Sequence, residues 1–444
     1  MSQYSSFMRK HGNLRKAWQT VKNNGRRSSS PYVRDDIDAF ASVEQANIKS
    51  LSAKLQHASF KFSPAKGVAL EKPNKPGSIR PIVIPRAADR VVQRCILDAL
   101  LTNSAIRAKA FQPLSFGGVP KQERHERAGV PAAIEALLRL ISEGGTHVIV
   151  GDIASFFTRI KKSDAVDNLA ALIPDDDKFL KLFREAIAVD IGNHEAIWRH
   201  KASFPYGDLG VGQGICLSPF LGNLVLADFD AAMNMGDCAC IRYVDDILII
   251  GPSGRAVSAQ YRKAVRLLSV KGMEFANDKT DRVPRPIDQT FSYLGIEFSK
   301  GRMRPDARSR TSIVDRVKEV AGRSLNEIRC AKAADSFNLD YSVPKTMSKI
   351  SGMSRGWANH YKFCNDVETI RNVDRLIARI FTHYSQAAML IADGHFQRND
   401  VDLGSALLGY VGSKGVAFTP LPMFRADIGA AIGLHGSTPL DHDG

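Results

Sequence analysis

Two adjacent acids interrupt an apolar stretch near the middle of the chain. Asp245 and Asp246 follow Tyr243-Val244 within the run of residues 240–250. A β-rich apolar segment broken by two acids predicts a strand, a tight turn and a second strand, with the acids at the tip. Carboxylates fixed on rigid backbone can hold Mg²⁺ for metal-assisted phosphoryl transfer. An ordinary Asp-Asp turn without chemistry is the alternative.

A third acid, Asp152, ends another apolar run, residues 148–151. The end of a strand can aim a side chain into a cleft while the strand itself stays buried. The alternative is a helix N-cap, because Asp is a favoured cap and residues 161–164 open a helical stretch. Together with Asp245 and Asp246, Asp152 predicts three carboxylates on two neighbouring strands. That arrangement suits two Mg²⁺ ions.

A glycine-rich loop, residues 207–214, lies between these acids in the sequence. It predicts close approach of the backbone to a substrate, although a plain connection is the alternative. The helix expected after it is amphipathic, and its apolar face would carry Phe220, Leu221, Leu224 and Val225. The loop is not a P-loop, because no Gly-Lys-Ser/Thr follows at the required spacing.

The order of these motifs resembles a reverse transcriptase, most closely the bacterial branch that includes group II intron maturases. The matching blocks are Arg80-Pro81-Ile82-Val83-Ile84-Pro85, Asp89-Arg90-Val91-Val92-Gln93, Leu114-Ser115-Phe116-Gly117, the Asp152 motif, Gln213-Gly214 with Leu217-Ser218-Pro219, the Asp245-Asp246 motif, Asn277-Asp278-Lys279-Thr280 and Tyr293-Leu294-Gly295. The resemblance covers about residues 14–369. It implies an α+β right-hand polymerase, with fingers and palm and a C-terminal α-helical thumb.

The resemblance also implies roles at the acids. Asp152 and Asp245 match the principal metal ligands, Asp246 matches the less directly coordinating acid, and Ile153 joins the metal-binding positions. The implied cofactor is Mg²⁺, as two ions, with Mn²⁺ as a substitute. Lys279 matches a lysine that protonates the departing pyrophosphate. A solvated surface lysine is the alternative.

Five residues match positions that hold the incoming nucleotide. Phe157 matches the bulky residue that excludes a 2′-hydroxyl, which implies a preference for dNTPs, and Phe156 is expected in the core. Gln213 matches a residue that touches the nucleotide. Lys72, Lys75 and Arg80 lie in the fingers segment whose cations hold the triphosphate, on a Pro/Gly-rich hairpin.

Two further segments match nucleic-acid contacts. Tyr293, Leu294 and Gly295 match the primer grip, in a segment that alternates like a hairpin strand. Residues 355–361 resemble the thumb helix of the maturase branch. Its basic side chains Lys349, Arg355 and Lys362 would follow the backbone of the template–primer, with a solvated helix face as the alternative.

Composition agrees with a polyanionic partner. The 444 residues hold 61 Lys and Arg against 46 Asp and Glu, a net charge of +15. The expected partners are a structured non-coding RNA template, the DNA product and dNTPs. A membrane is not expected, because no apolar run approaches the ~20 residues of a spanning helix. The first ten residues lack a signal-peptide core, so a cytoplasmic protein is expected.

The pattern along the chain predicts four segments. They are a basic helical N-terminal extension (1–61), fingers and palm (62–299), a helical maturase-like thumb (300–384) and a C-terminal tail (385–444). The tail carries no recognisable motif. It would complete the thumb or make contacts within a homo-oligomer or with an accessory protein.

Three biological settings remain open from the sequence. They are an endonuclease-free maturase that mainly binds and folds intron RNA, a retron enzyme, and a standalone antiphage reverse transcriptase. No Cys-x-x-Cys pair occurs, and nothing after Thr369 resembles the endonuclease module of many maturases. Residues 25–31 also replace the Gly-Val-Asp-Gly element of the family, and Val244 tells against a retron. Antiphage defence is the favoured hypothesis.

Overall fold

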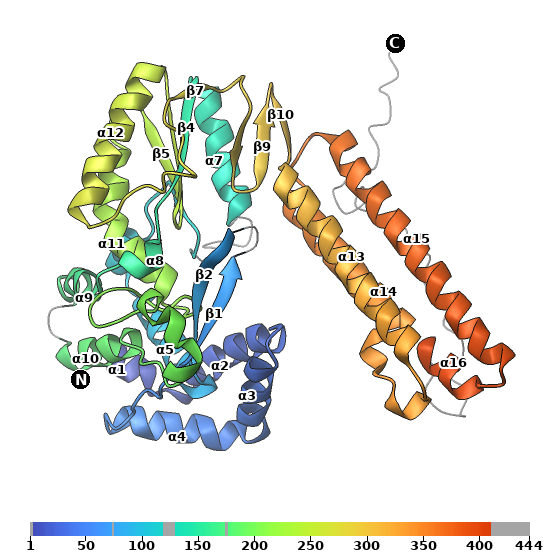
Figure 1. The fold of residues 1–444 in the computed structure, drawn as a ribbon. Coiled ribbons are helices and arrows are strands. Elements are labelled where there is room, and N and C mark those ends of the chain that lie inside the picture. Colours follow the sequence, from blue (N-terminus) through green and yellow to red (C-terminus); the bar gives the residue numbers. More distant parts are fainter. Residues whose placement is uncertain (1–2, 73–74, 119–128, 174–175, 410–444) are drawn as a thin grey trace, which may run out of the picture. The chain divides into compact units, whose positions relative to one another are not determined.

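The computed structural model describes residues 3–72, 75–118, 129–173 and 176–409, without the side chains of residues 75 and 76. These residues form two compact units, which divide between Pro286 and Ile287 (Figure 1). The first unit contains two β-sheets surrounded by helices. The second contains a small sheet followed by long helices.

Unit 1 begins with four helices, α1 (Gln3–Met8), α2 (His11–Arg26), α3 (Pro31–Ser42) and α4 (Glu44–Gln56). The expected apolar face of α2 is confirmed, because Leu14, Ala17, Trp18 and Val21 are all buried. This face packs against the helix α5 (Ala87–Leu100). The N-terminal helices therefore belong to the core of unit 1.

A two-stranded hairpin follows, formed by β1 (Lys66–Lys72) and β2 (Lys75–Ile84). The strands are antiparallel, and Lys66 pairs with Ile84 at the open end. Strand β2 leads into α5 and then into α6 (Ser104–Ala110). The two strands of the hairpin expected around residues 72–76 are confirmed, and residues 73 and 74 at its tip lie outside the described residues.

Helix α5 buries an acid in its first turn. Asp89 is 2% exposed, and its Oδ2 accepts a hydrogen bond from the backbone N–H of Ser63 at 3.1 Å. Burial raises the pKa of Asp89 to about 6, against the lowering effect of that hydrogen bond. An ionised Asp89 is therefore a destabilising feature of the fold.

We expect Asp89→Asn to stabilise unit 1 above pH 6 and not at pH 4. Between the unfolded pKa near 4 and the folded pKa of about 6, the folded state binds more protons, so its stability falls as the pH rises. The shift of about 2 pKa units corresponds to at most about 3 kcal/mol. Melting temperatures at pH 4, 6 and 8 measure this gain. An equal gain at all three values would contradict it.

The central sheet of unit 1 has five strands in the order β3-β5-β6-β4-β7. They are β3 (Ser115–Phe116), β4 (His147–Asp152), β5 (Ala239–Tyr243), β6 (Asp246–Gly251) and β7 (Arg285–Pro286). Strand β3 is parallel to β5, and the other pairs are antiparallel. The order places β4 and the β5–β6 hairpin side by side.

Helices cover both faces of this sheet. Helices α11 (Ser218–Met233) and α12 (Gly254–Val270) pack with one face, and α7 (Val130–Ser142) contacts β5 and β3. In Figure 1, α12 lies to the left of the strands and α7 to the right. Along β6, Ile247 and Ile249 belong to the buried cluster that contains Val257 of α12. Leu248 and Ile250 alternate with them and face the other side.

The remaining helices of unit 1 are α8 (Phe156–Arg159), α9 (Lys162–Ala170), α10 (Asp177–Ile187) and the 3₁₀-helix η1 (His194–Ser203). The expectation of an amphipathic α11 is wrong. Its four expected apolar residues are buried, but so are Gly222, Asn223, Leu226, Ala227 and Phe229. Since α6, α9, α12 and β5 all contact α11, it has no broad solvent face and serves as a central helix.

Unit 2 begins with a three-stranded sheet, β8 (Phe291–Tyr293), β9 (Ile296–Ser299) and β10 (Arg302–Pro305). Its helices are α13 (Ala307–Cys330), η2 (Ala334–Ser336), η3 (Leu339–Tyr341), α14 (Val343–Tyr361), α15 (Val367–Gln397) and α16 (Val401–Leu407). Among the described strands, β8 to β10 pair only with one another, and the two units divide after Pro286. Helix α15 continues through the expected boundary at 384.

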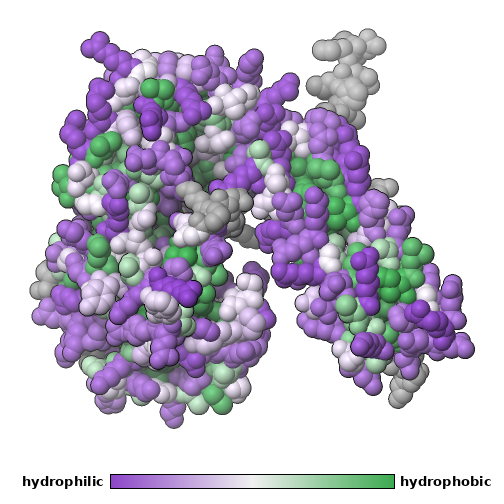
Figure 2. All heavy atoms as spheres, viewed as in Figure 1, coloured by the Kyte–Doolittle hydropathy of each residue, from purple (hydrophilic) through white to green (hydrophobic). Residues whose placement is uncertain are grey.

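Polar and charged residues cover most of the visible surface of each unit, with apolar residues in small patches (Figure 2). Among the described residues, no helix combines the length and the apolar character needed to cross a bilayer.

Candidate active site

The two adjacent acids lie at the tip of a hairpin, as predicted. Strands β5 and β6 are antiparallel, and Tyr243 pairs with Asp246 across the turn. Val244 and Asp245 form the turn, and Val244 has a φ of 60°. A β-branched residue is rarely found at positive φ, because its side chain crowds the backbone. The turn is therefore held by its surroundings and not by its own preference.

Asp152 lies directly opposite Asp246 in the register of β4 and β6. Directly opposed residues point to the same side of a sheet, with Cβ atoms about 4.5–5.5 Å apart. The next residue, Ile153, donates its backbone N–H to the carbonyl of Asp245 at 2.9 Å. The N-caps of the two following helices are Ser155 and Lys161, so the N-cap alternative for Asp152 is wrong.

Burial and the closeness of the three acids raise the pKa values of Asp245 and Asp246. Burial and then the charge of Asp152 raise the pKa of Asp245, while Lys279 and Arg80 oppose the shift. Burial and the charges of Asp245 and Asp152 raise the pKa of Asp246 to about 7. The cluster therefore carries more negative charge than its surroundings neutralise, and it favours a bound cation.

Lys279 supplies one such cation. Its Nζ forms an ion pair with Oδ2 of Asp152, although half of the lysine side chain remains exposed. Burial lowers the pKa of Lys279, but the hydrogen bond to Asp152 and the charges of all three acids outweigh burial and raise it. Lys279 is thus a charged member of the site and not a solvated surface lysine.

The residues present fit a divalent cation shared with a substrate. Carboxylate oxygens are the hard donors that Mg²⁺ prefers, and the ammonium on Asp152 shows that this position accepts positive charge. Across the described ranges, no three His, Cys, Asp or Glu side chains converge tightly enough to hold an ion alone. Mg²⁺ commonly uses one or two carboxylates and completes its shell with substrate phosphates and water.

Divalent-cation binding is expected to weaken as the pH falls through 7. A cation favours the ionised form of Asp246, so below its pKa of about 7 binding must release a proton. Titration calorimetry in two buffers of different ionisation enthalpy should show proton release at pH 6.5 and little at pH 8.5. Asp246→Asn should abolish the difference. Equal release at both pH values would contradict the assignment.

A family model described as reverse transcriptase (RNA-dependent DNA polymerase) matches residues 70–298, just over half of the chain. The chain belongs to the reverse transcriptase family. The matched range includes all three acids and Lys279. The fold is α+β, and reverse transcriptases in general use divalent metal ions.

Three known proteins are similar to parts of this chain. Protein YkfC of Escherichia coli (strain K12) is 31% identical over 173 residues, which are 38% of this chain and 40% of that protein. The chain thus spans less than half of that relative. Apo telomerase from Candida tropicalis is 11% identical with a TM-score of 0.43, covering 78% of this chain and 69% of that chain. A Cas6-RT-Cas1–Cas2 complex is 16% identical with a TM-score of 0.33, covering 60% and 26%.

Phe156 and Phe157 occupy different environments in this reverse transcriptase. Phe156 is 2% exposed, as expected for a core residue, and its ring rests on Gly222 of α11, where an added Cβ would lie 2.7 Å from the ring. Phe157 is only partly buried at the edge of the core. Its carbonyl accepts a hydrogen bond from Val211 at 2.8 Å. Phe157 therefore keeps a surface that a substrate can contact.

The other nucleotide candidates lie on the neighbouring segments. The carbonyl of Gln213 accepts a hydrogen bond from Val83 of β2 at 2.7 Å, which fixes the glycine-rich loop against the hairpin. Arg80, on the same strand, is exposed, and its charge acts on Asp245. Lys72 is exposed at the end of β1. The side chain of Lys75 lies outside the described residues.

The primer-grip candidates form a hairpin turn in unit 2. Tyr293 pairs with Ile296, and the two residues between them, Leu294 and Gly295, have φ values of 52° and 77°. Two consecutive residues at positive φ are typical of a type I′ turn, which matches the twist of the strands. The predicted alternating hairpin is confirmed.

The thumb candidates Lys349, Arg355 and Lys362 are all exposed on or beside α14. Lys349 and Arg355 lie roughly 120° apart around the helix, so they do not form one row. The same helix borders a pocket of about 370 Å³ against α13, lined among others by Arg316, Trp357 and His360. The sequence prediction missed this pocket, although the aromatic residues of the motif at 355–361 were a signal.

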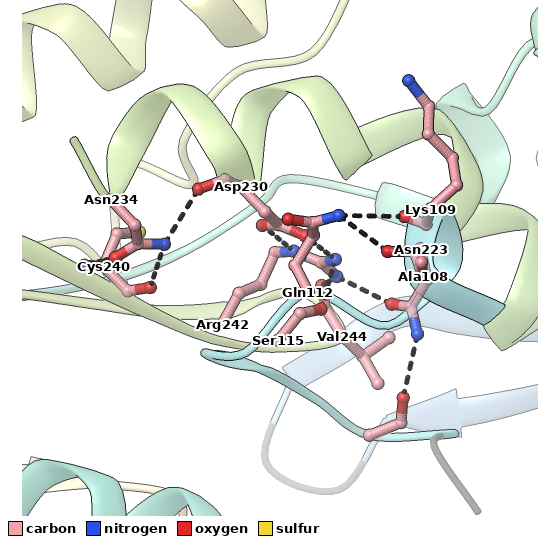
Figure 3. Close-up of polar contacts among 11 residues, drawn as sticks. Ala108, Lys109, Gln112, Ser115, Asn223, Asp230, Asn234, Cys240, Arg242 and Val244 are labelled. Atoms are coloured by element: carbon pink, nitrogen blue, oxygen red, sulfur yellow. Dashed lines mark hydrogen bonds and ion pairs between the residues drawn. The ribbon is translucent and has the colours of Figure 1, made fainter. Parts of the chain in front are cut away.

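Sequence reasoning also missed a buried polar cluster behind the turn formed by Val244 and Asp245 (Figure 3). Arg242 is fully buried and pairs with Asp230 of α11. The interpretation of residues 240–242 as simply apolar is therefore wrong. The signal was present, because a charged residue stands in an otherwise apolar strand immediately before the acids.

Proposed function

We propose that this member of the reverse transcriptase family is an RNA-directed DNA polymerase that copies a dedicated, structured non-coding RNA into DNA in antiphage defence. The main support for a polymerase site is that three carboxylates lie close together. Asp152 is at the end of β4, and Asp245 and Asp246 are at the tip of the β5–β6 hairpin. The support for a dedicated template is the segment 25–31, which departs from the maturase pattern and joins α2 to α3.

In the proposed reaction, Asp152 and Asp245 are the principal ligands of divalent cations, with Asp246 and the backbone at Ile153 beside them. Bound Mg²⁺, or Mn²⁺ in its place, would favour the alkoxide of the primer 3′-hydroxyl and neutralise the charge of the pyrophosphate. The register of β4 and β6 orients these carboxylates before substrate arrives. Preorganised charges of this kind need little rearrangement in the transition state.

The surrounding residues position the nucleotide. Arg80, together with Lys72 and Lys75, would bind the triphosphate, and Gln213 and Phe157 would contact the base and sugar. Lys279 would leave Asp152 as the divalent cations bind and donate the proton on Nζ to the departing pyrophosphate. Its raised pKa keeps that proton available at neutral pH.

The proposed nucleic-acid path follows the basic surfaces. The net charge of +15 favours an RNA template and its DNA product over a neutral partner. In unit 2, Tyr293, Leu294 and Gly295 would contact the primer, and Lys349, Arg355 and Lys362 would contact phosphates. We retain the N-terminal extension (1–61), fingers and palm (62–299) and thumb (300–384) as functional segments. The segment 385–444 would contact a second copy of the chain or an accessory protein.

An endonuclease-free intron maturase is the second candidate. The observation that favours it is the resemblance of residues 355–361, which form the C-terminal part of α14, to a maturase thumb helix. Such a protein would bind and fold intron RNA and use polymerisation little.

Sequencing of the RNA and cDNA that copurify with the protein from its host, with and without phage challenge, separates these roles. One locus-adjacent RNA with discrete or repetitive cDNA would support a dedicated template and defence. A spliced intron RNA would instead establish the maturase role. A broad mixture of cellular RNA with no cDNA would contradict both proposals.

A further inference from the structure

A fully buried arginine lies directly behind the turn that carries the acids. Arg242 is on β5, two residues before Val244, and its exposed fraction is zero. Its Nε donates to Oδ1 of Asp230 at 2.8 Å, and its Nη2 donates to Oδ2 of the same carboxylate at 2.5 Å. This two-point contact orients the guanidinium plane. Asp230 is itself only 3% exposed and belongs to α11.

The other donors of Arg242 reach three different segments. Nη2 also donates to the hydroxyl of Ser115 on β3 at 2.7 Å, and Nη1 donates to Oδ1 of Asn223 on α11 at 3.1 Å. A second bond from Nη1 goes to the carbonyl of Val244 at 3.0 Å. A guanidinium has five N–H groups, and these five bonds match that number. Figure 3 shows the contacts converging on Arg242 from both sides.

The last of these contacts holds the strained residue of the turn. Val244 keeps a φ of 60°, which a valine does not favour. Its carbonyl is bound by Arg242, and its N–H donates to the carbonyl of Phe116 at 3.2 Å. Its side chain lies on Gly117, where an added Cβ would be 2.5 Å from Cγ2 of Val244. Strained conformations persist only where several neighbours fix them in this way.

The helix α11, which holds Arg242 through Asp230 and Asn223, is buried along most of its length. Helix α11 is buried on nearly all sides, and Asp230 and Asn223 both project from it toward Arg242. Asn223 also donates to the carbonyl of Gly117 at 3.4 Å, so the same helix holds both segments that contact the turn. Displacement of Arg242 would release Val244, and with it Asp245 and Asp246, from the central helix.

We propose that Arg242 is a positioning residue for polymerisation, which fixes the turn bearing Asp245 and Asp246 by tying the carbonyl of Val244 to Asp230 and Asn223 on α11. Arg242 acts through the backbone and touches neither nucleotide nor template. The inference rests on the proposed roles of Asp245 and Asp246. A lysine cannot replace it, because one ammonium cannot span the carboxylate, the amide and the carbonyl with the geometry of a guanidinium.

The test compares the double variant Arg242→Met/Asp230→Leu with the wild type. Removal of one partner alone would leave a buried charge and unfold the protein, whereas apolar replacement of both partners of a buried pair is often neutral for stability. We expect the double variant to fold with a lower melting temperature, because Ser115, Asn223 and the carbonyl of Val244 lose a donor, and to keep an unchanged Kd for template–primer. The kcat for primer extension should fall at least tenfold, and half-saturation by Mg²⁺ should shift to higher concentration.

A matched control is available on the same strand. The side chain of Asn234 binds both backbone groups of Cys240, at the end of β5 away from the acids, and also donates to the backbone carbonyl of Asp230 without touching Arg242. Asn234→Ala should lower the melting temperature and leave the kcat per folded molecule within twofold of the wild type. A tenfold loss in this variant would mean that general loosening of β5 explains the effect, which would overturn the inference.

Asn223→Ala provides a second test if the double variant does not fold. It removes one bond to Arg242 and the bond to Gly117, and we expect a kcat at least threefold lower at unchanged template–primer affinity. A folded double variant, or this single variant, with kcat within twofold of the wild type overturns the inference. Asp245→Ala separates the two proposals, because activity in that variant would defeat the proposed site itself.

Discussion

Asp245→Asn is expected to reduce primer extension by about three orders of magnitude while the protein remains folded. The substitution keeps the shape of the side chain and removes the charge that would bind a divalent cation, an interaction that supplies several kcal/mol in metal-assisted reactions. Burial and the charge of Asp152 already raise the pKa of Asp245, so loss of this charge also relieves repulsion within the site. The melting temperature should therefore hold or rise. Single-nucleotide extension under Mg²⁺ measures the rate.

A matched control for this variant is Asp237→Asn. Asp237 precedes β5 and is exposed. Its substitution by Asn therefore removes the same negative charge at a position away from the turn. We expect wild-type extension from it, and unchanged RNA binding from both variants. Mg²⁺-dependent synthesis by Asp245→Asn at a tenth of the wild-type rate or more would rule out the proposed metal site.

Phe157→Ala is expected to let the enzyme incorporate ribonucleotides. The side chain of Phe157 is partly buried, and its carbonyl accepts a hydrogen bond from Val211, so the residue lies beside the glycine-rich loop. Removal of the ring would open space for a 2′-hydroxyl. Discrimination by the shape of an apolar pocket amounts to about 10- to 200-fold, and we expect a loss of that size in the ratio of kcat/KM for dNTP over rNTP.

The comparison variant at this position is Phe157→Tyr, which retains the ring and should retain the selectivity. Phe156 is unsuitable as a control because its ring packs on Gly222 in the core. If Phe157→Ala lowered kcat/KM for dNTP and rNTP by the same factor, Phe157 would be a packing residue and the dNTP preference would lie elsewhere.

The parts of the site that follow a local pattern were predictable from sequence. An apolar run broken by two acids gave the β5–β6 hairpin, and an apolar run ending on Asp152 gave β4. The buried face of α2 followed from helical spacing. In each case the neighbours that define the structure are close in sequence or share a strand pair, so residue types alone indicate the geometry.

The parts that depend on distant partners were not predictable. Arg242 meets Asp230 and Ser115 across sequence separations of 12 and 127 residues, and no local pattern marks that pairing. The burial of α11 on most sides likewise comes from helices before and after it in the chain. The contact of Lys279 with Asp152 spans 127 residues and became apparent only in three dimensions.

Lys279 gives the acid cluster a positive charge when no substrate is bound. An ammonium held on Asp152 partly neutralises the acid cluster without any bound ion, so the protein carries its own counterion during synthesis and storage. If Asp152 binds a divalent cation as proposed, a metal ion arriving alone would displace this ammonium, whereas a nucleotide would bring both the ion and phosphates to which the ammonium can transfer. Under that proposal, the protein would bind metal ions that arrive with a nucleotide in preference to metal ions that arrive alone.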